Sequence, residues 1–252
     1  MKKRIALILT GTMLMGFVLS ACGDNESTEK KDEKTENSVE TSSNANNRTT
    51  FTVGFDAEYP PYGYMDENGE YTGFDLELAE AVCKLEGWEL VKKPINWDAK
   101  DMELNSGAID CIWNGFTMNG REDEYTFSTP YVDNSQVIVV AENSGINTPE
   151  DLAGKTVGVQ AASAALELLQ SDEKDGQKAL ADTFGALNEF ADYNTAFTEL
   201  QAGALDALAI DIGVANYQIK SRGEGYKILE ETLNTEQYAI AFKKGDQELR
   251  DV

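Results

Sequence analysis

The chain has 252 residues, 41% of them apolar, and its 45 acidic and 21 basic side chains give a formal net charge of -24. So acidic a chain, with no basic cluster, is not expected to bind nucleic acid, because that binding depends on neutralising phosphates with lysine and arginine. Histidine is absent, which excludes histidine-based triads and histidine zinc sites. We predict no metal site and no cofactor.

The N-terminus has the pattern of a secretion signal. A basic Lys-Lys-Arg start precedes the apolar run 5–18, which is shorter than the roughly 20 residues that span a bilayer. Cys22 follows Leu-Ser-Ala and resembles the bacterial lipobox, in which cleavage precedes a cysteine that carries diacylglycerol. We predict a signal peptide at 1–21 and a lipid anchor at Cys22, on the extracytoplasmic face of the cell membrane. Ordinary secretion with an incidental cysteine is the alternative.

Residues 22–50 are polar almost throughout, with one Val, one Ala and no aromatic side chain. Such a segment cannot bury enough apolar surface to offset the entropy lost on ordering. We predict a disordered tether whose r.m.s. span is about 30 Å.

From residue 51 the chain alternates strand-like and helix-like segments. The pattern predicts a strand at 51–55, a hairpin with arms at 64–65 and 71–72, a helix at 76–85, a strand at 88–95, a short helix at 100–105, and strands at 109–113 and 136–140. Cys83 and Cys111 lie in apolar segments of this region. We interpret them as core thiols, with a disulfide between them as the less favoured alternative.

A second unit of the same kind follows residue 141. The pattern predicts a helix start at Thr148-Pro149, a strand at 155–159, a helix at 163–170, a loop at 171–178, a helix at 196–202, a strand at 207–210, a helix at 214–219 and strands at 225–229 and 238–242. Alternating strands and helices indicate an α/β protein with two lobes, each a mostly parallel sheet flanked by helices. We predict lobe 1 at 51–140 plus 236–252 and lobe 2 at 141–235, with hinges near 139–141 and 235–238.

The stretch 110–121 is the most informative part of the chain. An apolar strand runs into a glycine-containing turn that ends on Arg121, whose guanidinium offers a planar fork that fits a carboxylate. Asp211 follows another buried strand, and the carboxyl ends of strands are where α/β sheets bind ligands. A zwitterion taken out of water needs both charges paired. Arg121 and Asp211 therefore indicate a zwitterion site between the lobes.

Several separated motifs occur in a characteristic order from about residue 51 to residue 250: VGFDAEYPPYGY, TGFDLELAEAV, NSGAIDCIWNGFTMNGRED, FSTPYV, EDLAGKTVGVQ, and GALDALAID followed by YAIAFKKGDQELR. In these motifs the chain resembles the polar amino acid-binding proteins of ABC importers, which have the type II periplasmic-binding-protein fold. The resemblance implies two lobes with the ligand in the cleft between them.

The resemblance also implies a set of ligand-binding residues. Arg121 would pair with the α-carboxylate, Asp211 would receive the α-ammonium, Tyr59 would cover one face of the ligand, and Asp56 would meet its side chain. The full set is Asp56, Tyr59, Trp97, Lys100, Trp113, Asn114, Gly115, Thr117, Arg121, Gln160, Ser163, Ala164 and Asp211.

The chain departs from the family pattern at four points. The turn before Arg121 is one residue shorter, and we expect Gly120 to absorb the difference through a tighter turn. Ala162-Ser163-Ala164 replaces a loop richer in glycine and hydroxyls. Lys100 replaces an aliphatic residue; it either faces a polar or acidic ligand side chain or is solvated. The chain stops at Val252, before one or two helices that the family normally has, so lobe 1 is expected to be truncated.

The sequence therefore predicts a monomeric, lipid-anchored receptor that captures a free amino acid, with a polar side chain favoured, and delivers it to an ABC permease without catalysing a reaction. The alternatives are a ligand-sensing domain and a secreted dehydratase-type enzyme on the same fold.

Overall fold

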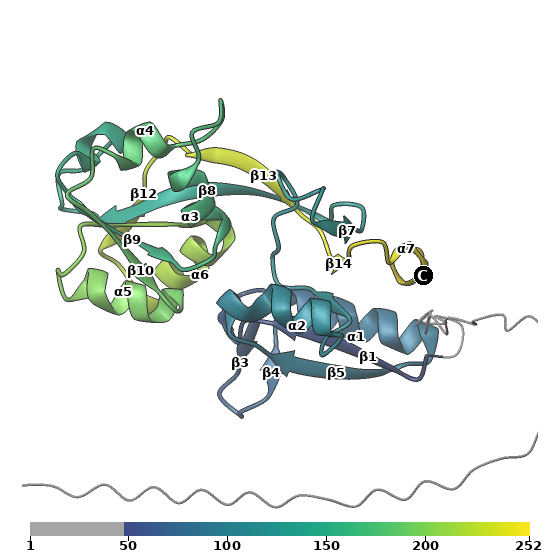
Figure 1. Cartoon of the computed structure of the whole chain (residues 1–252). Coiled ribbons are helices and arrows are strands. Elements are labelled where there is room, and N and C mark those ends of the chain that lie inside the picture. The colour runs from purple at the N-terminus through teal and green to yellow at the C-terminus, as the bar shows by residue number, and fades with distance from the viewer. Residues whose placement is uncertain (1–47) are drawn as a thin grey trace, which may run out of the picture. The chain divides into compact units, whose positions relative to one another are not determined.

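Two separate sheets with flanking helices dominate residues 48–252, the part of the chain that the computed structural model describes (Figure 1). The predicted signal peptide, Cys22 and most of the predicted tether lie outside these residues. No helix within the described range is long and apolar enough to cross a membrane.

The first sheet has the strand order β5-β1-β6-β14-β7. Its strands are β1 (Thr50–Phe55), β5 (Glu89–Pro94), β6 (Cys111–Ile112), β7 (Tyr125–Phe127) and β14 (Ala241–Lys243). β1 is parallel to β5 and β6, whereas β14 is antiparallel to β6 and β7. The helical segments of this lobe are α1 (Phe74–Glu86), the 3-10 turn η2 (Trp97–Ala99), α2 (Lys100–Ser106) and α7 (Gln247–Arg250).

A small antiparallel sheet lies beside α1 in the sequence. It consists of β2 (Glu58–Tyr59), β3 (Gly63–Met65) and β4 (Tyr71–Thr72), in that order. The β3–β4 hairpin is the one that the Asn-Gly turn predicted.

The second sheet has the strand order β10-β9-β11-β8-β12, with β13 also paired to β8. Its strands are β8 (Val132–Ala141), β9 (Thr156–Gln160), β10 (Ala186–Phe190), β11 (Ala207–Asp211), β12 (Tyr226–Ile228) and β13 (Asn234–Tyr238). β9, β10 and β11 run parallel, and β8 is antiparallel to its neighbours. Its helical segments are η3 (Pro149–Leu152), α3 (Ala164–Gln170), α4 (Lys178–Ala181), α5 (Tyr193–Gln201) and α6 (Ile212–Arg222).

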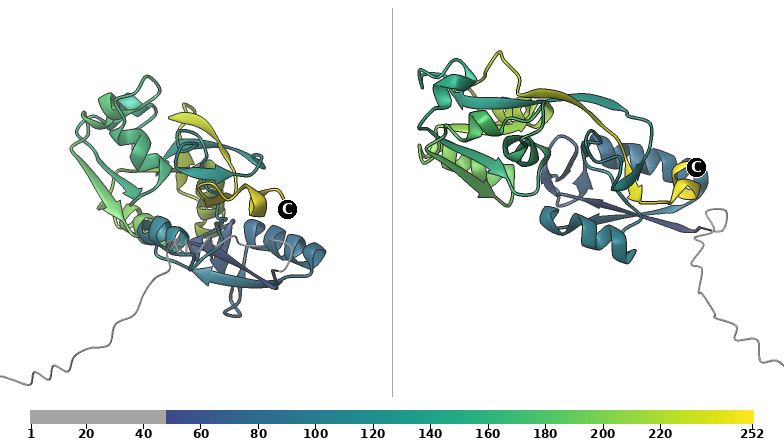
Figure 2. Two further views of the ribbon diagram at one scale, coloured as in Figure 1. Left: turned by 45° about the vertical axis from the view of Figure 1, so that its right-hand side comes forward. Right: turned by 45° about the horizontal axis from the view of Figure 1, so that its top comes forward.

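The paired strands β8 and β13 carry the chain between the two sheets (Figure 2). The chain enters the second sheet at Val132 and returns to the first sheet between Tyr238 and Ala241. The predicted first hinge near 139–141 was therefore placed too late, because those residues lie inside β8. The polar first half of β8 pairs with β13, so the strand extends well beyond its apolar run.

Each sheet has its own apolar core. In the first lobe, Val53, Leu76 and Cys111 pack together with Cys83, and both cysteines are free thiols. This confirms their interpretation as core residues and excludes the disulfide. In the second lobe, Val139 and Ile210 belong to a cluster that also takes in Tyr59 and Tyr62 of the first lobe. Apolar contacts as well as polar ones therefore connect the two lobes.

Candidate functional site

A small cavity lies where residues of the two lobes meet. It has a volume of about 10 Å³ and is lined by Tyr59, Trp97, Gly115, Phe116, Thr117 and Arg121 of the first lobe and by Gln160, Ser163, Ala164 and Asp211 of the second. Every lining residue except Phe116 belongs to the predicted set. This volume is about that of one water molecule, so the side chains of the two lobes nearly fill the space between them in this structure.

Arg121 lines the cavity, and its side chain is 6% exposed. The backbone N–H of Arg121 donates to the carbonyl of Met118 at 3.0 Å, and Gly120 has a φ of 81°. This tight turn, with a left-handed residue at its third position, confirms that Gly120 absorbs the short spacing. The guanidinium carbon lies 4.7 Å from the centroid of the Phe116 ring, a distance that favours a cation–π contact. The turn and the ring together fix the position of the positive charge.

Asp211 lines the same cavity and is the last residue of β11. It is 3% exposed. As the residue before α6, an aspartate would ordinarily cap the helix, but its carboxylate makes no such bond. It instead accepts hydrogen bonds from Asn134, Gln136 and Tyr238 at 2.7, 2.8 and 2.5 Å. The Asp211 carboxylate therefore faces the cavity, and α6 has no side-chain cap.

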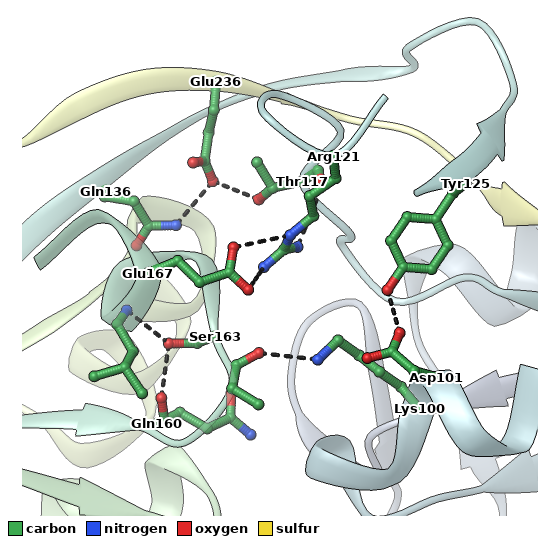
Figure 3. Close-up of polar contacts among 12 residues, drawn as sticks. Lys100, Asp101, Thr117, Arg121, Tyr125, Gln136, Gln160, Ser163, Glu167 and Glu236 are labelled. Carbon is green, nitrogen blue, oxygen red and sulfur yellow. Dashed lines mark hydrogen bonds and ion pairs between the residues drawn. The ribbon is translucent and has the colours of Figure 1, made fainter. Parts of the chain in front are cut away.

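A second buried carboxylate, Glu236, accompanies Asp211. The side-chain amide of Gln136 donates to Glu236 at 2.8 Å, and the Thr117 hydroxyl donates to it at 2.7 Å (Figure 3). The amide of Asn134 also donates to Glu236, at 2.8 Å. Burial, and next the charge of Glu236, raise the pKa of Asp211 to about 6. Two carboxylates held this close, with amides between them, form a strongly electronegative end of the cavity that suits a cationic group.

Glu236, Asn134 and Gln136 were missed by the sequence reasoning. Asn134 and Gln136 stand at alternate positions just before the apolar run of β8, so both side chains lie on one face of the strand. Glu236 is the registered partner of Asn134 across the β8–β13 pair. Polar side chains at alternate positions at the start of a buried strand are the sequence signal for Asn134 and Gln136.

Asp56, Gln160 and Lys100 form a third group of polar contacts between the lobes. Asp56 accepts a hydrogen bond from the Gln160 amide at 2.6 Å, and burial raises its pKa to about 6. Lys100 is 5% exposed and its ammonium donates to the carbonyl of Ala162 at 3.2 Å. Burial, and next the charge of Arg121, lower the pKa of Lys100. The solvated interpretation of Lys100 is therefore wrong.

Aromatic rings and one glycine shape the walls. The Tyr59 ring lies 6.1 Å from that of Tyr193 on α5. Gly115 has a φ of 58°, and a Cβ built on it would lie 3.0 Å from the Tyr238 ring and 3.1 Å from Tyr59. Both the backbone conformation and the space therefore require glycine here.

The hydroxyl groups of the predicted set are engaged within the protein. Ser163 caps α3 by accepting from the N–H of Leu166 at 3.2 Å, and it donates to the carbonyl of Gln160 at 2.7 Å. Ala162 before it has a φ of 54°, a conformation that usually selects glycine. The substituted loop thus keeps the backbone geometry that a glycine would give.

The remaining predicted residues support the cavity without lining it. Trp113 is buried against Tyr131 at 6.3 Å between ring centroids. The side-chain oxygen of Asn114 accepts from the N–H of Asp56 at 2.7 Å. Both side chains therefore hold the strand ends in place.

Comparison with known proteins identifies the family. Residues 51–252 match the bacterial extracellular solute-binding proteins, family 3. The chain belongs to this family. Its members are binding proteins, so the chain is not an enzyme, and its fold is the two-lobed type II periplasmic-binding-protein fold that the sequence predicted.

Relatives of this solute-binding protein include two curated proteins and a solved structure. The L-cystine-binding protein TcyJ of Escherichia coli (strain K12) is 30% identical over 80% of this chain and 74% of its own length. The arginine-binding extracellular protein ArtP of Bacillus subtilis (strain 168) is 29% identical over 100% of this chain and 89% of its own length. The crystal structure of an ABC uptake transporter substrate-binding protein from Streptococcus pneumoniae with bound histidine has a TM-score of 0.75 and 35% identity, covering 80% of this chain and 82% of that chain.

Proposed function

We propose that this protein binds a free amino acid and delivers it to an ABC permease. The observation that carries the proposal is a pair of opposite charges in one cavity: the Arg121 guanidinium and the Asp211 carboxylate both line it, and Glu236 shares two amide donors with Asp211. A zwitterion needs both of these charges to leave water. The cystine, arginine and histidine named for the relatives are all amino acids, which agrees with this reading.

We infer that the ligand carries a polar side chain with hydrogen-bond donors. The Asp56 end of the site adjoins a cleft of about 530 Å³ whose lining includes Asp56, Glu58, Asp98 and Asp192. Glu103 lines it as well, and these five carboxylates favour a donor group and disfavour an acidic one. Lys100 is already engaged by a backbone carbonyl and offsets only part of this negative charge.

Thermal unfolding of the full chain in the presence of each of the twenty amino acids, and of cystine, tests the proposal. A ligand at about 100 times its Kd adds about 2.7 kcal/mol to the free energy of unfolding, which for a domain of this size raises the Tm by several degrees. Isothermal titration then gives the Kd of every amino acid that shifts the Tm. The absence of any shift across the panel would refute the proposal.

We further propose attachment to the extracytoplasmic membrane face through Cys22 and action as a monomer. The lipobox-like sequence supports the first, and a site complete within one chain supports the second. Delivery is tested by uptake of the identified amino acid in cells with and without the protein. Unchanged uptake would contradict a role in import.

A further inference from the structure

Glu167 of the second lobe forms an ion pair with Arg121 across the cleft. Its two carboxylate oxygens lie 3.0 Å from Nε and 2.7 Å from Nη2 of the guanidinium (Figure 3). The contact is a side-on ion pair in which Nε donates a hydrogen bond to Oε2, and Nη2 lies beside Oε1 without a hydrogen bond. Among residues 48–252, no other carboxylate lies within 4.0 Å of this guanidinium.

We propose that Glu167 is a gating residue: its carboxylate competes with the ligand's carboxylate for Arg121 and thereby sets the affinity for the ligand. The inference rests on the proposed function, because the competitor is the α-carboxylate of an amino acid. Glu167 acts through Arg121 and is a positioning residue, not one that lines the site cavity.

Arg121 already makes polar contacts on two sides and an aromatic contact on one face. Glu167 takes the Nε–Nη2 edge, the carbonyl of Thr117 accepts from Nη1 at 3.3 Å, and Phe116 covers one face of the guanidinium. A ligand carboxylate that binds this guanidinium would share one positive charge with Glu167. Like charges at such distances repel, so the contact opposes ligand binding whichever edge the ligand uses.

The Glu167 side chain is also free to move away from Arg121. Its side chain is 54% exposed, whereas that of Arg121 is 6% exposed. Because Glu167 is already largely hydrated, its movement into water changes its solvation little. It lines a cleft of about 770 Å³ that shares Thr117 and Ala164 with the site cavity. The arginine is therefore the fixed partner, and the glutamate has space in which to swing aside.

Affinities of Glu167 variants test the competition. Glu167→Gln keeps the size and removes the charge, Glu167→Ala removes the contact, and Glu189→Gln is the control, because Glu189 is exposed on β10 of the same lobe. Calorimetric titration of the full chains uses the amino acid that stabilises the wild-type protein most. Both Glu167 variants are expected to bind it about two- to fivefold more tightly, the range that loss of an exposed ion pair allows. The control should match the wild type.

Thermal unfolding without amino acid gives a second readout. Because the ion pair connects the lobes, both Glu167 variants should have a slightly lower Tm while their affinity rises. If Glu167 had only a structural role, its replacement would lower both the Tm and the affinity for the amino acid. That result would overturn the inference, and so would an unchanged affinity. If neither the wild type nor any variant binds an amino acid, the proposed function fails and this inference falls with it; if the wild type binds, only the comparison among variants decides.

Discussion

Replacing Asp211 by asparagine is expected to separate ligand binding from stability. Asp211 is buried beside Glu236, and the two carboxylates share the amides of Asn134 and Gln136. Asparagine keeps an oxygen that can accept these hydrogen bonds, but it removes one of two like charges. We therefore expect the variant to lose amino acid binding while its folded state without ligand becomes more stable.

The size of the gain follows from the pKa. Burial and Glu236 raise the pKa of Asp211 from 3.8 to about 6. Since each pKa unit is worth about 1.4 kcal/mol, holding Asp211 charged at neutral pH costs the folded state about 3 kcal/mol at most. Part of this is lost when the neutral amide accepts weaker hydrogen bonds, so a net gain of about 2 kcal/mol, or roughly 4–8 °C in Tm, is expected.

The sign of the pH dependence provides a second check. Because the folded-state pKa of Asp211 lies above its ordinary value of 3.8, the folded state binds the proton more tightly than the unfolded chain does. The stability attributable to this group is thus fully present below pH 3.8 and is lost as the pH rises through about 6. Burial raises the pKa of Asp56 and Asp75 in the same direction, so the variant should lose only part of the wild type's dependence.

Thermal unfolding at about pH 4.5 and about pH 7, on the two sides of the raised pKa, measures the change in stability. Calorimetric titration at neutral pH measures the loss of amino acid binding. Asp123→Asn is the control, because Asp123 is exposed and its replacement removes the same charge. A lower Tm for Asp211→Asn at pH 7 would refute the reasoning about repulsion. Retained affinity would refute the assignment of the ammonium to Asp211.

Three further predictions concern the site and the N-terminus. Arg121→Ala should weaken binding of every amino acid about 100-fold or more, since it leaves a carboxylate without its partner; calorimetry checks this, and near-wild-type affinity contradicts the assignment. Gly115→Ala should lower both affinity and Tm further than Gly107→Ala, because both residues have positive φ but only Gly115 lies against Tyr238; equal effects would exclude the clash. Cys22→Ser should release the protein from the membrane, as fractionation of cells would show, and continued membrane attachment would contradict lipidation.

Most of the fold could be predicted because its strands and helices carry strong apolar periodicity. β1, β9 and β11 are short apolar runs, and their order along the chain indicates parallel sheets. β10 was missed because Ala-Leu-Asn-Glu-Phe is an edge strand whose residues are exposed or half-buried. β13 was missed because Asn-Thr-Glu-Gln-Tyr is polar. Both strands are recognisable only from their partners in the sheet, which are distant in the sequence.

The residues lining the cavity could be predicted for a related reason. Arg121, Gln160, Ser163 and Asp211 all follow strands or begin helices, and strand ends converge in an α/β sheet. What could not be predicted is which hydrogen bonds their functional groups make within the protein. The hydroxyl of Ser163 is engaged by its own helix, a result that depends on side-chain rotamers and not on position along the chain.

Each charge of the zwitterion site is accompanied by a carboxylate that no motif includes. Glu167 approaches Arg121 from the opposite lobe, and Glu236 accompanies Asp211 from the strand that returns to the first lobe. Both pairings depend on tertiary contacts. Glu167 partly neutralises the positive charge of Arg121, whereas Glu236 adds to the negative charge of Asp211. Under the proposed function, the motif residues recognise the carboxylate and ammonium groups of an amino acid. We propose that the two glutamates make the site more negative and thereby favour ligands whose positive groups outnumber their negative ones.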